Sequence, residues 1–447
     1  MSRNAGHSLF IIRYGFPFFY GYIILAAATL GKIMTYSGQS PIIGLFIEPV
    51  RTELNLDRAQ IALLYLVATT TSALMLPLMG RFIDRFGVQI VVSGVTTGLG
   101  FACFLFSKVR SVPMLLLAFF MLRFFGQGSL MLVSQTAINF WWVRRRGTMM
   151  GVGGAIMSLG MIGVMIPVMK ALIDSIGWRR TYVVNALLCW LMMLPIGAGL
   201  FRNKPETYGL QPDGDGKGEG YFEIEDMEVE KAEERAGKDE EEETEIIWTT
   251  QQALCTWSFW SIALGTSEIA ATGTAYWYHL PSVCMDAGLS IEVTTMLYPV
   301  SAVISVGVRL IGGYLIDRKE PRCLLAIGLV LHAVGLALVL FSHPISMFAS
   351  IIMISAANAF MLNTAGVAYA QFFGRTHLGT IASFGNSMVV LGSAGKRGHT
   401  TRSGLTKTIK KCCCCITLDR RLTLAFLSLF VCFSFSHIHK LVLILSV

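Results

Sequence analysis

Two similar segments, GRFIDRFG at residues 80–87 and GYLIDRK at residues 313–319, each end an apolar run of about twenty residues. In both segments the glycine lets a helix end pack closely against a neighbour. The acid that follows, with a base directly after it, can tie neighbouring helix ends together. Asp84 and Asp317 are 233 residues apart, about the length of six helices with a linker. The repeat therefore predicts two halves with the same order of helices.

The composition excludes a soluble globular protein. Of the 447 residues, 54% are apolar and 14% are charged, whereas about a quarter of the residues of a soluble protein are charged. A helix of about 20 apolar residues crosses a hydrocarbon core of about 30 Å, so we predict an all-α polytopic membrane protein. Its first helix is expected to be a retained anchor and not a cleaved signal peptide. The predicted spans lie near 18–47, 59–80, 88–107, 112–140, 148–173, 178–201, 257–283, 290–313, 323–342, 346–373 and 378–395.

The charge distribution predicts the domain boundaries. Residues 202–250 hold 17 of the 28 acidic and 6 of the 36 basic residues, so we expect a mostly disordered linker at 202–256. It separates a first half at 1–201 from a second half at 257–395. Short loops on the linker's side are richer in basic residues, which places the N-terminus and the linker in the cytoplasm. The basic residues predicted for the opposite side are Arg51, Arg58, Lys108, Arg110, Arg179 and Arg180.

The loop at 80–87 also matches a family signature, Gly-x-x-x-Asp-Arg-x-Gly, and on it the chain resembles the major facilitator superfamily. Further stretches, YGY at 20–22, RFFGQGS at 123–129 and WVRRRG at 142–147, look most like its oxalate/formate antiporter and monocarboxylate porter branch. The resemblance implies a major facilitator fold of two six-helix halves, a monomer, and Tyr22 as a substrate contact. The residues to which it gives gating or structural roles are Gly80, Asp84, Arg85, Gly87, Arg123, Gly313, Asp317 and Arg318.

The tail at 396–447 departs from this pattern. Its composition turns basic at Lys396, and four cysteines follow one another at 412–415. We interpret the tail as the product of a frameshift or retained intron, which leaves the last helix or two aberrant. The alternative is a genuine basic tail whose juxtamembrane cysteines accept palmitate. Residues 422–435 with 441–447 are the candidate for a surrogate last helix.

Charged residues inside the spans are the candidates for function, because each costs at least about 2.5 kcal/mol near the bilayer centre. Arg309 precedes Asp317 by eight residues, about 12 Å along a helix and close to the midplane. Its repeat counterpart is Leu76, so Arg309 is not part of the shared scaffold. We interpret it as an anion-binding residue, since a guanidinium suits a carboxylate; a contact between helices is the alternative. Lys32 is the candidate for a second positive charge.

Two further residues are candidates for proton coupling or substrate binding. Glu268 lies about 16 Å into the seventh span, where desolvation would favour its protonated form; a bond to a neighbouring helix is the alternative. His279 lies nearer the outer mouth beside three aromatic residues. It is a candidate for binding substrate or a proton, and an interfacial aromatic belt is the alternative.

These patterns favour a secondary transporter that moves a small carboxylate by alternating access, as a multi-pass protein of the plasma membrane. A rival interpretation is a proton-coupled antiporter of uncharged or cationic compounds. Another is a non-transporting sensor, or a product inactivated by its tail. The expected partners are an anionic small molecule, protons and the lipid bilayer. The sequence contains no phosphate-binding loop and no paired His or Cys metal motif, so we expect no enzymatic activity, cofactor, metal or nucleic-acid partner.

Overall fold

The computed structural model describes residues 18–214, 248–339, 341 and 343–394. The chain divides after Lys396 into two units, and every described residue belongs to the first. Within the described ranges the secondary structure is helical throughout, with no strand, which confirms the predicted all-α class. The centre of the predicted linker and the whole predicted tail, with its surrogate helix, lie outside the described residues.

The described part of the first half is built from six helical stretches, in which η1 is a 3₁₀ helix and η2, η3 and η4 are π-helical segments. Each stretch corresponds to one predicted span; for example, the third was predicted at 88–107 and runs from Val88 to Ser107. The segments are α2 (Gly21–Met34), η1 (Thr35–Gly38), α3 (Ser40–Glu53), α4 (Arg58–Phe86), α5 (Val88–Ser107), α6 (Val112–Met121), η2 (Leu122–Leu130), α7 (Met131–Trp141), α8 (Arg146–Ser158), η3 (Leu159–Met165), α9 (Ile166–Ile176), α10 (Trp178–Leu188), η4 (Cys189–Met193) and α11 (Leu194–Leu200).

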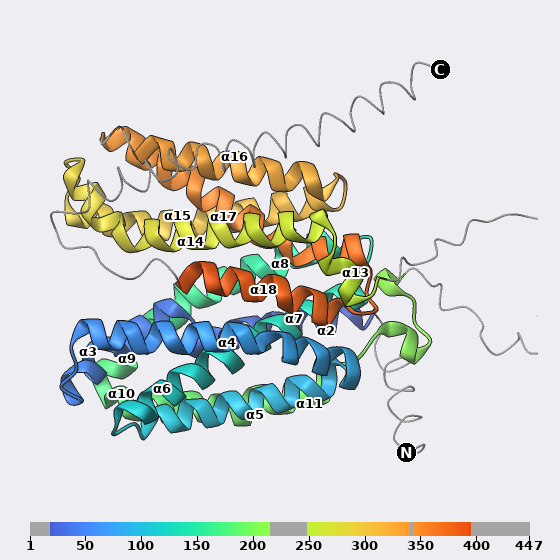
Figure 1. The fold of residues 1–447 in the computed structure, drawn as a ribbon, viewed down its shortest axis with the longest axis horizontal. Coiled ribbons are helices and arrows are strands. Elements are labelled where there is room, and N and C mark those ends of the chain that lie inside the picture. Colours follow the sequence, from blue (N-terminus) through green and yellow to red (C-terminus); the bar gives the residue numbers. More distant parts are fainter. Residues whose placement is uncertain (1–17, 215–247, 340, 342, 395–447) are drawn as a thin grey trace, which may run out of the picture. The chain divides into compact units, whose positions relative to one another are not determined.

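The described second half follows the same predicted order. Eight helical stretches of the described chain are long and apolar enough to cross a membrane by length and composition. Between the halves, α4 packs against α18 and α8 packs against α15 (Figure 1). The segments are α13 (Thr250–Leu254), α14 (Trp257–Asp286), α15 (Ile291–Ile316), α16 (Pro321–Val339), α17 (Pro344–Phe373) and α18 (Leu378–Ala394).

The first span is broken, whereas the sequence predicted one continuous helix at 18–47. After η1 the backbone of Gln39 is extended, with φ −83° and ψ 144°, and α3 starts again with Pro41 in its first turn. The break lies against η2, since a Cβ on Gly38 would collide with the carbonyl oxygen of Leu122. Arg123 Nη1 donates to the Gly38 carbonyl at 3.2 Å. The arginine thus satisfies a backbone acceptor that the break releases inside the bundle.

The described start of the predicted linker, residues 202–214, is folded onto the first half. Residues 202–214 include two 3₁₀ turns, η5 (Pro205–Tyr208) and η6 (Pro212–Gly214). Asp213 accepts hydrogen bonds from the backbone N–H groups of Val143, Arg144 and Arg145 at 2.8 to 3.1 Å. Glu206 forms an ion pair of 2.6 Å with Arg375 of the second half. This part of the predicted linker therefore connects the two halves.

Candidate functional site

The first repeat motif joins α4 of the first half to α18 of the second. Asp84 accepts the backbone N–H groups of Gly379 and Thr380, each at 2.8 Å, and the Thr380 hydroxyl at 2.6 Å. Both partners belong to the first turn of α18. A carboxylate is favourable at this position because the N-terminus of a helix carries unpaired N–H groups and a partial positive charge.

The second motif makes the same contact with the halves exchanged. Asp317, directly after α15, accepts the Gly147 N–H at 2.5 Å and the N–H and hydroxyl of Thr148 at 2.8 and 2.6 Å. Gly147 and Thr148 lie in the first turn of α8. The sequence repeat thus corresponds to two matching carboxylate caps, each of which joins the two halves at the end of the bundle that carries the 202–214 segment.

The motif glycines allow the helices to approach at these contacts. A Cβ on Gly80 would collide with the carbonyl oxygen of Gly379, and one on Gly313 would lie 2.6 Å from that of Gly147. Backbone atoms cannot move aside as a flexible side chain can. The structure therefore has the close helix packing at these two glycines that the sequence predicted.

The remaining motif residues stay within their own half. Arg85 is exposed with its guanidinium over the Phe86 ring, at 5.4 Å, and Arg318 lies over Tyr314 at 4.2 Å. Gly87 has a φ of +80° at the start of α5, a conformation that favours glycine.

Two cations from different halves contact one face of α8. Lys32 of α2 is 3% exposed, and its Nζ lies 3.5 Å from the sulfur of Met150. Arg309 of α15 reaches Gly154, where an added Cβ would lie 2.8 Å from Nη1. Met150 and Gly154 are one helical turn apart, and the charges of Lys32 and Arg309 repel each other. In the described ranges, neither cation forms an ion pair with a carboxylate.

Asn363 of α17 orients Arg309 and was not among the residues predicted from the sequence. Arg309 Nη1 donates to Asn363 Oδ1 at 3.1 Å, and Asn363 Nδ2 donates to the Arg309 carbonyl at 2.9 Å. The Nε of Arg309 is buried and has no hydrogen-bond partner among the described residues. The signal that could have identified it was an amide within an apolar span, which also contains Asn358 and Gln371. A second missed polar contact joins buried His332 of α16 to Thr272 of α14, at 2.7 Å.

The other predicted site residues do not join this pair of cations. Tyr22 is 44% exposed and packs on Trp142 near the start of α2, about 15 Å along the helix from Lys32. Tyr22 is therefore not part of the site that Lys32 and Arg309 form. Arg123 is 2% exposed, and besides Gly38 it contacts the Ser40 hydroxyl and the Tyr65 ring. Its contacts are those of a structural residue that supports the break in the first span.

Glu268 is exposed on α14 in the described part of the chain, and its role in proton coupling stays a prediction. Its backbone carbonyl accepts the Thr272 hydroxyl at 2.8 Å. His279 also lies on α14, but its side chain is outside the described part of the structure. Within that part, no group of three or more His, Cys, Asp or Glu side chains forms a metal site.

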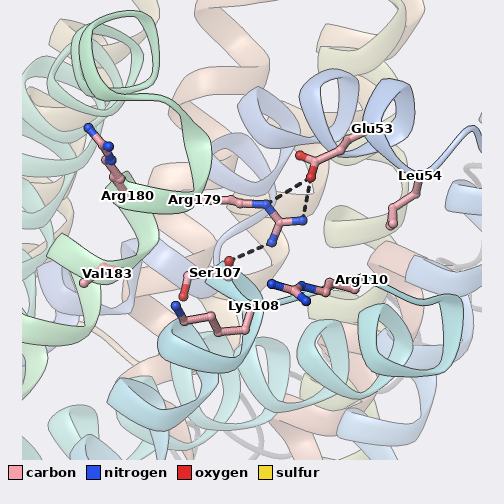
Figure 2. Close-up of a pocket in the computed structure, with 8 residues that line it drawn as sticks. All are labelled: Glu53, Leu54, Ser107, Lys108, Arg110, Arg179, Arg180 and Val183. Carbon is pink, nitrogen blue, oxygen red and sulfur yellow. Dashed lines mark hydrogen bonds and ion pairs between the residues drawn. The ribbon is translucent and has the colours of Figure 1, made fainter.

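A pocket of about 480 Å³ lies where α3, α5 and α10 meet, at the end of the first half opposite Asp84. Figure 2 shows the Arg179 guanidinium between Glu53 and Ser107. Arg179 binds Glu53 at 2.7 Å, and Trp178 Nε1 donates to the same carboxylate at 2.9 Å. The hydrogen bond from Arg179 holds the pKa of Glu53, which lies beyond the predicted span, below its ordinary value.

The fold agrees with comparisons to known proteins. Over 364 residues the chain is 22% identical to the "Uncharacterized MFS-type transporter YhjX" of Escherichia coli (strain K12), covering 79% of this chain and 80% of that protein. The proton:xylose symporter XylE bound to 6-bromo-6-deoxy-D-glucose has a similar structure, with a TM-score of 0.61, 15% identity and coverage of 84% and 86%. The human organic anion transporter MFSD10 has a TM-score of 0.59, 13% identity and coverage of 84% and 92%.

The two structural likenesses, at such low identity, concern the fold alone. The family itself follows from the sequence profile described as "Major Facilitator Superfamily", which matches residues 13–395. Since that match spans most of the chain, the protein belongs to the Major Facilitator Superfamily of membrane transporters.

Proposed function

We propose that this protein is a secondary transporter that moves a small carboxylate across the plasma membrane, with its N-terminus and linker in the cytoplasm. Lys32 and Arg309 bind the carboxylate between the two halves. The single observation that carries the proposal is the pair itself: a buried Lys32 from one half and a partly buried Arg309 from the other, on the same face of α8. An anion placed between them would contact both halves at once.

The energetics of the pair favour an anionic substrate. A charge near the bilayer centre costs at least about 2.5 kcal/mol, and two like charges add their mutual repulsion. A bound carboxylate offsets both terms, because it attracts each cation and accepts their hydrogen bonds. Arg309 suits this role, since Asn363 fixes one edge of its guanidinium while its Nε has no partner among the described residues. A planar guanidinium can then bind a carboxylate with two parallel hydrogen bonds.

Alternating access would require the contacts of Asp84 and Asp317 to break and form again in each cycle. Both carboxylates hold the halves together at one end of the bundle, so the structure represents a state closed at that end. Opening this end exposes the cation pair to the same side. We propose that a substrate bound by both halves couples the opening of this end to the exposure of Lys32 and Arg309.

Arg309→Ala should abolish saturable uptake of a labelled carboxylate by proteoliposomes, while membrane abundance stays near that of the wild type. Arg309→Lys should restore little, because an ammonium lacks the fork of the guanidinium. Lys32→Ala should raise the half-saturating concentration about tenfold or more, since a charge-assisted hydrogen bond contributes about 1.5–3 kcal/mol.

The compounds tested for uptake should be formate, oxalate, lactate, xylose and a quaternary amine. The control variant is Lys170→Ala. Lys170 is an exposed cation of the same half, paired with Asp174. Near wild-type carboxylate uptake by Arg309→Ala would exclude the assignment. Saturable uptake of xylose or the amine without any carboxylate uptake would favour a transporter of non-anionic compounds.

A further inference from the structure

The pocket at the meeting of α3, α5 and α10 gathers positive charge from one loop and from the start of one helix. Lys108 and Arg110 come from the loop after α5, and Arg179 and Arg180 from the first turn of α10. The acidic residue that lines the pocket is Glu53. These four bases are among the six that the sequence predicts for this end of the protein, and the fold brings them to one cavity.

The neighbouring acids are already occupied. Glu48 binds both Arg51 and Arg58, at 2.8 and 3.1 Å. Glu53 binds Arg179. In the part of the chain that the structure describes, Lys108, Arg110 and Arg180 form no ion pair with a carboxylate, and all three are exposed. The pocket therefore has three basic side chains without an acidic partner.

Arg179 gives this charge a fixed framework. It donates to the backbone carbonyls of Ser107 at 2.8 Å and Val109 at 2.6 Å while it is held by Glu53. These bonds fix the loop on either side of Lys108, whose ammonium lies 5.7 Å from the centre of the Phe104 ring. The backbone that carries the bases is thus positioned before any ligand binds, which lowers the entropic cost of binding.

We propose that this pocket binds a phosphate group through Lys108, Arg110 and Arg180, supplied either by the headgroup of an anionic lipid or by a free phosphate anion. Guanidinium groups bind phosphate oxygens in pairs, and an ammonium adds a compact point charge. The volume of about 480 Å³ exceeds what one phosphate fills, and Leu54 and Val183 provide an apolar wall beside the bases. A lipid would place its phosphate on the bases and its glycerol against that wall.

The test uses the full chain and the triple variant Lys108→Gln, Arg110→Gln and Arg180→Gln, which removes three charges and leaves Arg179 and Glu53 intact. In one arm, both proteins are placed in phosphatidylcholine nanodiscs with or without phosphatidylglycerol, and retained phosphatidylglycerol is counted by native mass spectrometry. In the other arm, the proteins are in neutral detergent, and their melting temperatures are compared in inorganic phosphate and in chloride at equal ionic strength.

Wild-type protein should retain phosphatidylglycerol or be stabilised by phosphate, and the triple variant should bind about tenfold or more weakly. Arg58→Gln, an exposed charge outside the pocket, should bind like the wild type. An effect in the first arm alone identifies a lipid headgroup, and one in the second alone identifies free phosphate.

The single variant Arg110→Gln keeps the test valid if the triple variant melts at a much lower temperature without ligand. It should weaken binding in the same arm as the triple variant. Equal binding by the wild type and a folded variant in both arms would overturn the proposal. The assay measures no transport, so its outcome is independent of the proposed carboxylate transport.

Discussion

Asp84 and Asp317 each join two helices from different halves through one carboxylate. Each accepts two backbone N–H groups and a threonine hydroxyl. Hydrogen bonds to a charged group contribute about 1.5–3 kcal/mol each, so either carboxylate can strongly bias the balance between closed and open states. Neither contacts the Lys32 and Arg309 pair among the described interactions. Their effect on transport should therefore differ from that of a substrate-binding residue.

Asp84→Asn should lower the maximal uptake rate severalfold more than it changes the equilibrium affinity for substrate. The amide keeps the size of the side chain but loses the charge and one acceptor, so the state closed at this end becomes less populated. Uptake rates across substrate concentrations, together with equilibrium binding, check this. Asp174→Asn, an exposed acid of the same half, is the control. A loss confined to binding affinity would contradict the role as a latch.

Glu53 provides a pH-dependent contact at the other end of the first half. Its folded-state pKa is lowered by the Arg179 hydrogen bond, so its stabilisation is present above the unfolded pKa of about 4.3. The stabilisation is lost as the pH falls through the lowered folded-state pKa. Because the pair is partly exposed, it contributes about 1 kcal/mol or less.

Glu53→Gln should therefore melt slightly below the wild type at pH 7, and the two melting temperatures should converge as the pH falls below about 4. The amide can still accept a hydrogen bond from Trp178, so the variant tests the charge more than the packing. Thermal melting of both proteins in detergent between pH 7 and pH 3 measures the difference. A gap that stays constant over this range would show that the charge of Glu53 does not contribute.

Among the elements of the fold, the 202–214 segment behaves as part of the bundle. Trp141 Nε1 donates to the Asn203 carbonyl at 2.7 Å, and Asp213 caps the backbone just before α8. The α8 helix also carries the Asp317 contact and the surface against which Lys32 and Arg309 lie. A segment predicted as linker therefore stabilises the start of the helix that binds Asp317 and lies against Lys32 and Arg309.

Asp213→Asn should lower the free energy of unfolding by about 1–2 kcal/mol, because a neutral acceptor replaces a charged one at three N–H groups. Asn tolerates the positive φ of 62° at this position, so the backbone turn is kept. Chemical or thermal unfolding in detergent measures the change. Gln211→Ala, an exposed neighbour, should behave like the wild type; an equal loss in both variants would contradict the capping role.

Across the described bundle, the two halves meet where small residues permit backbone contact. Gly313 lies against Gly147 and Gly151, and a Cβ there would come 2.6 Å from a carbonyl oxygen and 3.1 Å from a Cα. Asn139 of α7 adds a hydrogen bond of 2.8 Å to the Gly366 carbonyl of α17. The packing of the halves at this end thus depends on glycine positions as well as on the two carboxylates.

Gly313→Val should reduce uptake more than about tenfold, because weakening the packing between the halves by over about 1.4 kcal/mol shifts their equilibrium by that factor. Gly307→Val is the matched control, because it lies on the same helix and has nothing within 4 Å of an added Cβ. Both changes carry the same cost in helix propensity. Membrane abundance and melting temperature show whether the variants fold. Equal uptake by the two would contradict the close packing at Gly313.

Local sequence was enough to locate the helices and to pair them into halves. Hydrocarbon requires apolar runs of about 20 residues whose backbone bonds are satisfied within the helix, so spans such as α5 could be located from composition. The repeat around Asp84 and Asp317 also predicted that the two acids act in equivalent places. Each apolar run and each copy of the motif is a short local pattern, and comparing the two copies needs no knowledge of the folded chain.

Which residues meet across the bundle could be learned only from the folded chain. Asp84 and Thr380 are 296 positions apart, and no local pattern identifies such a partner. The same holds for Asn363 beside Arg309, for the four bases in one pocket, and for the exposed position of Glu268. The break in the first span was not predicted, because the Gly38 carbonyl that it frees is bound by Arg123, which lies in another helix. These features depend on long-range packing. The local sequence around each side chain is compatible with several neighbours, and only the folded chain decides which of them it meets.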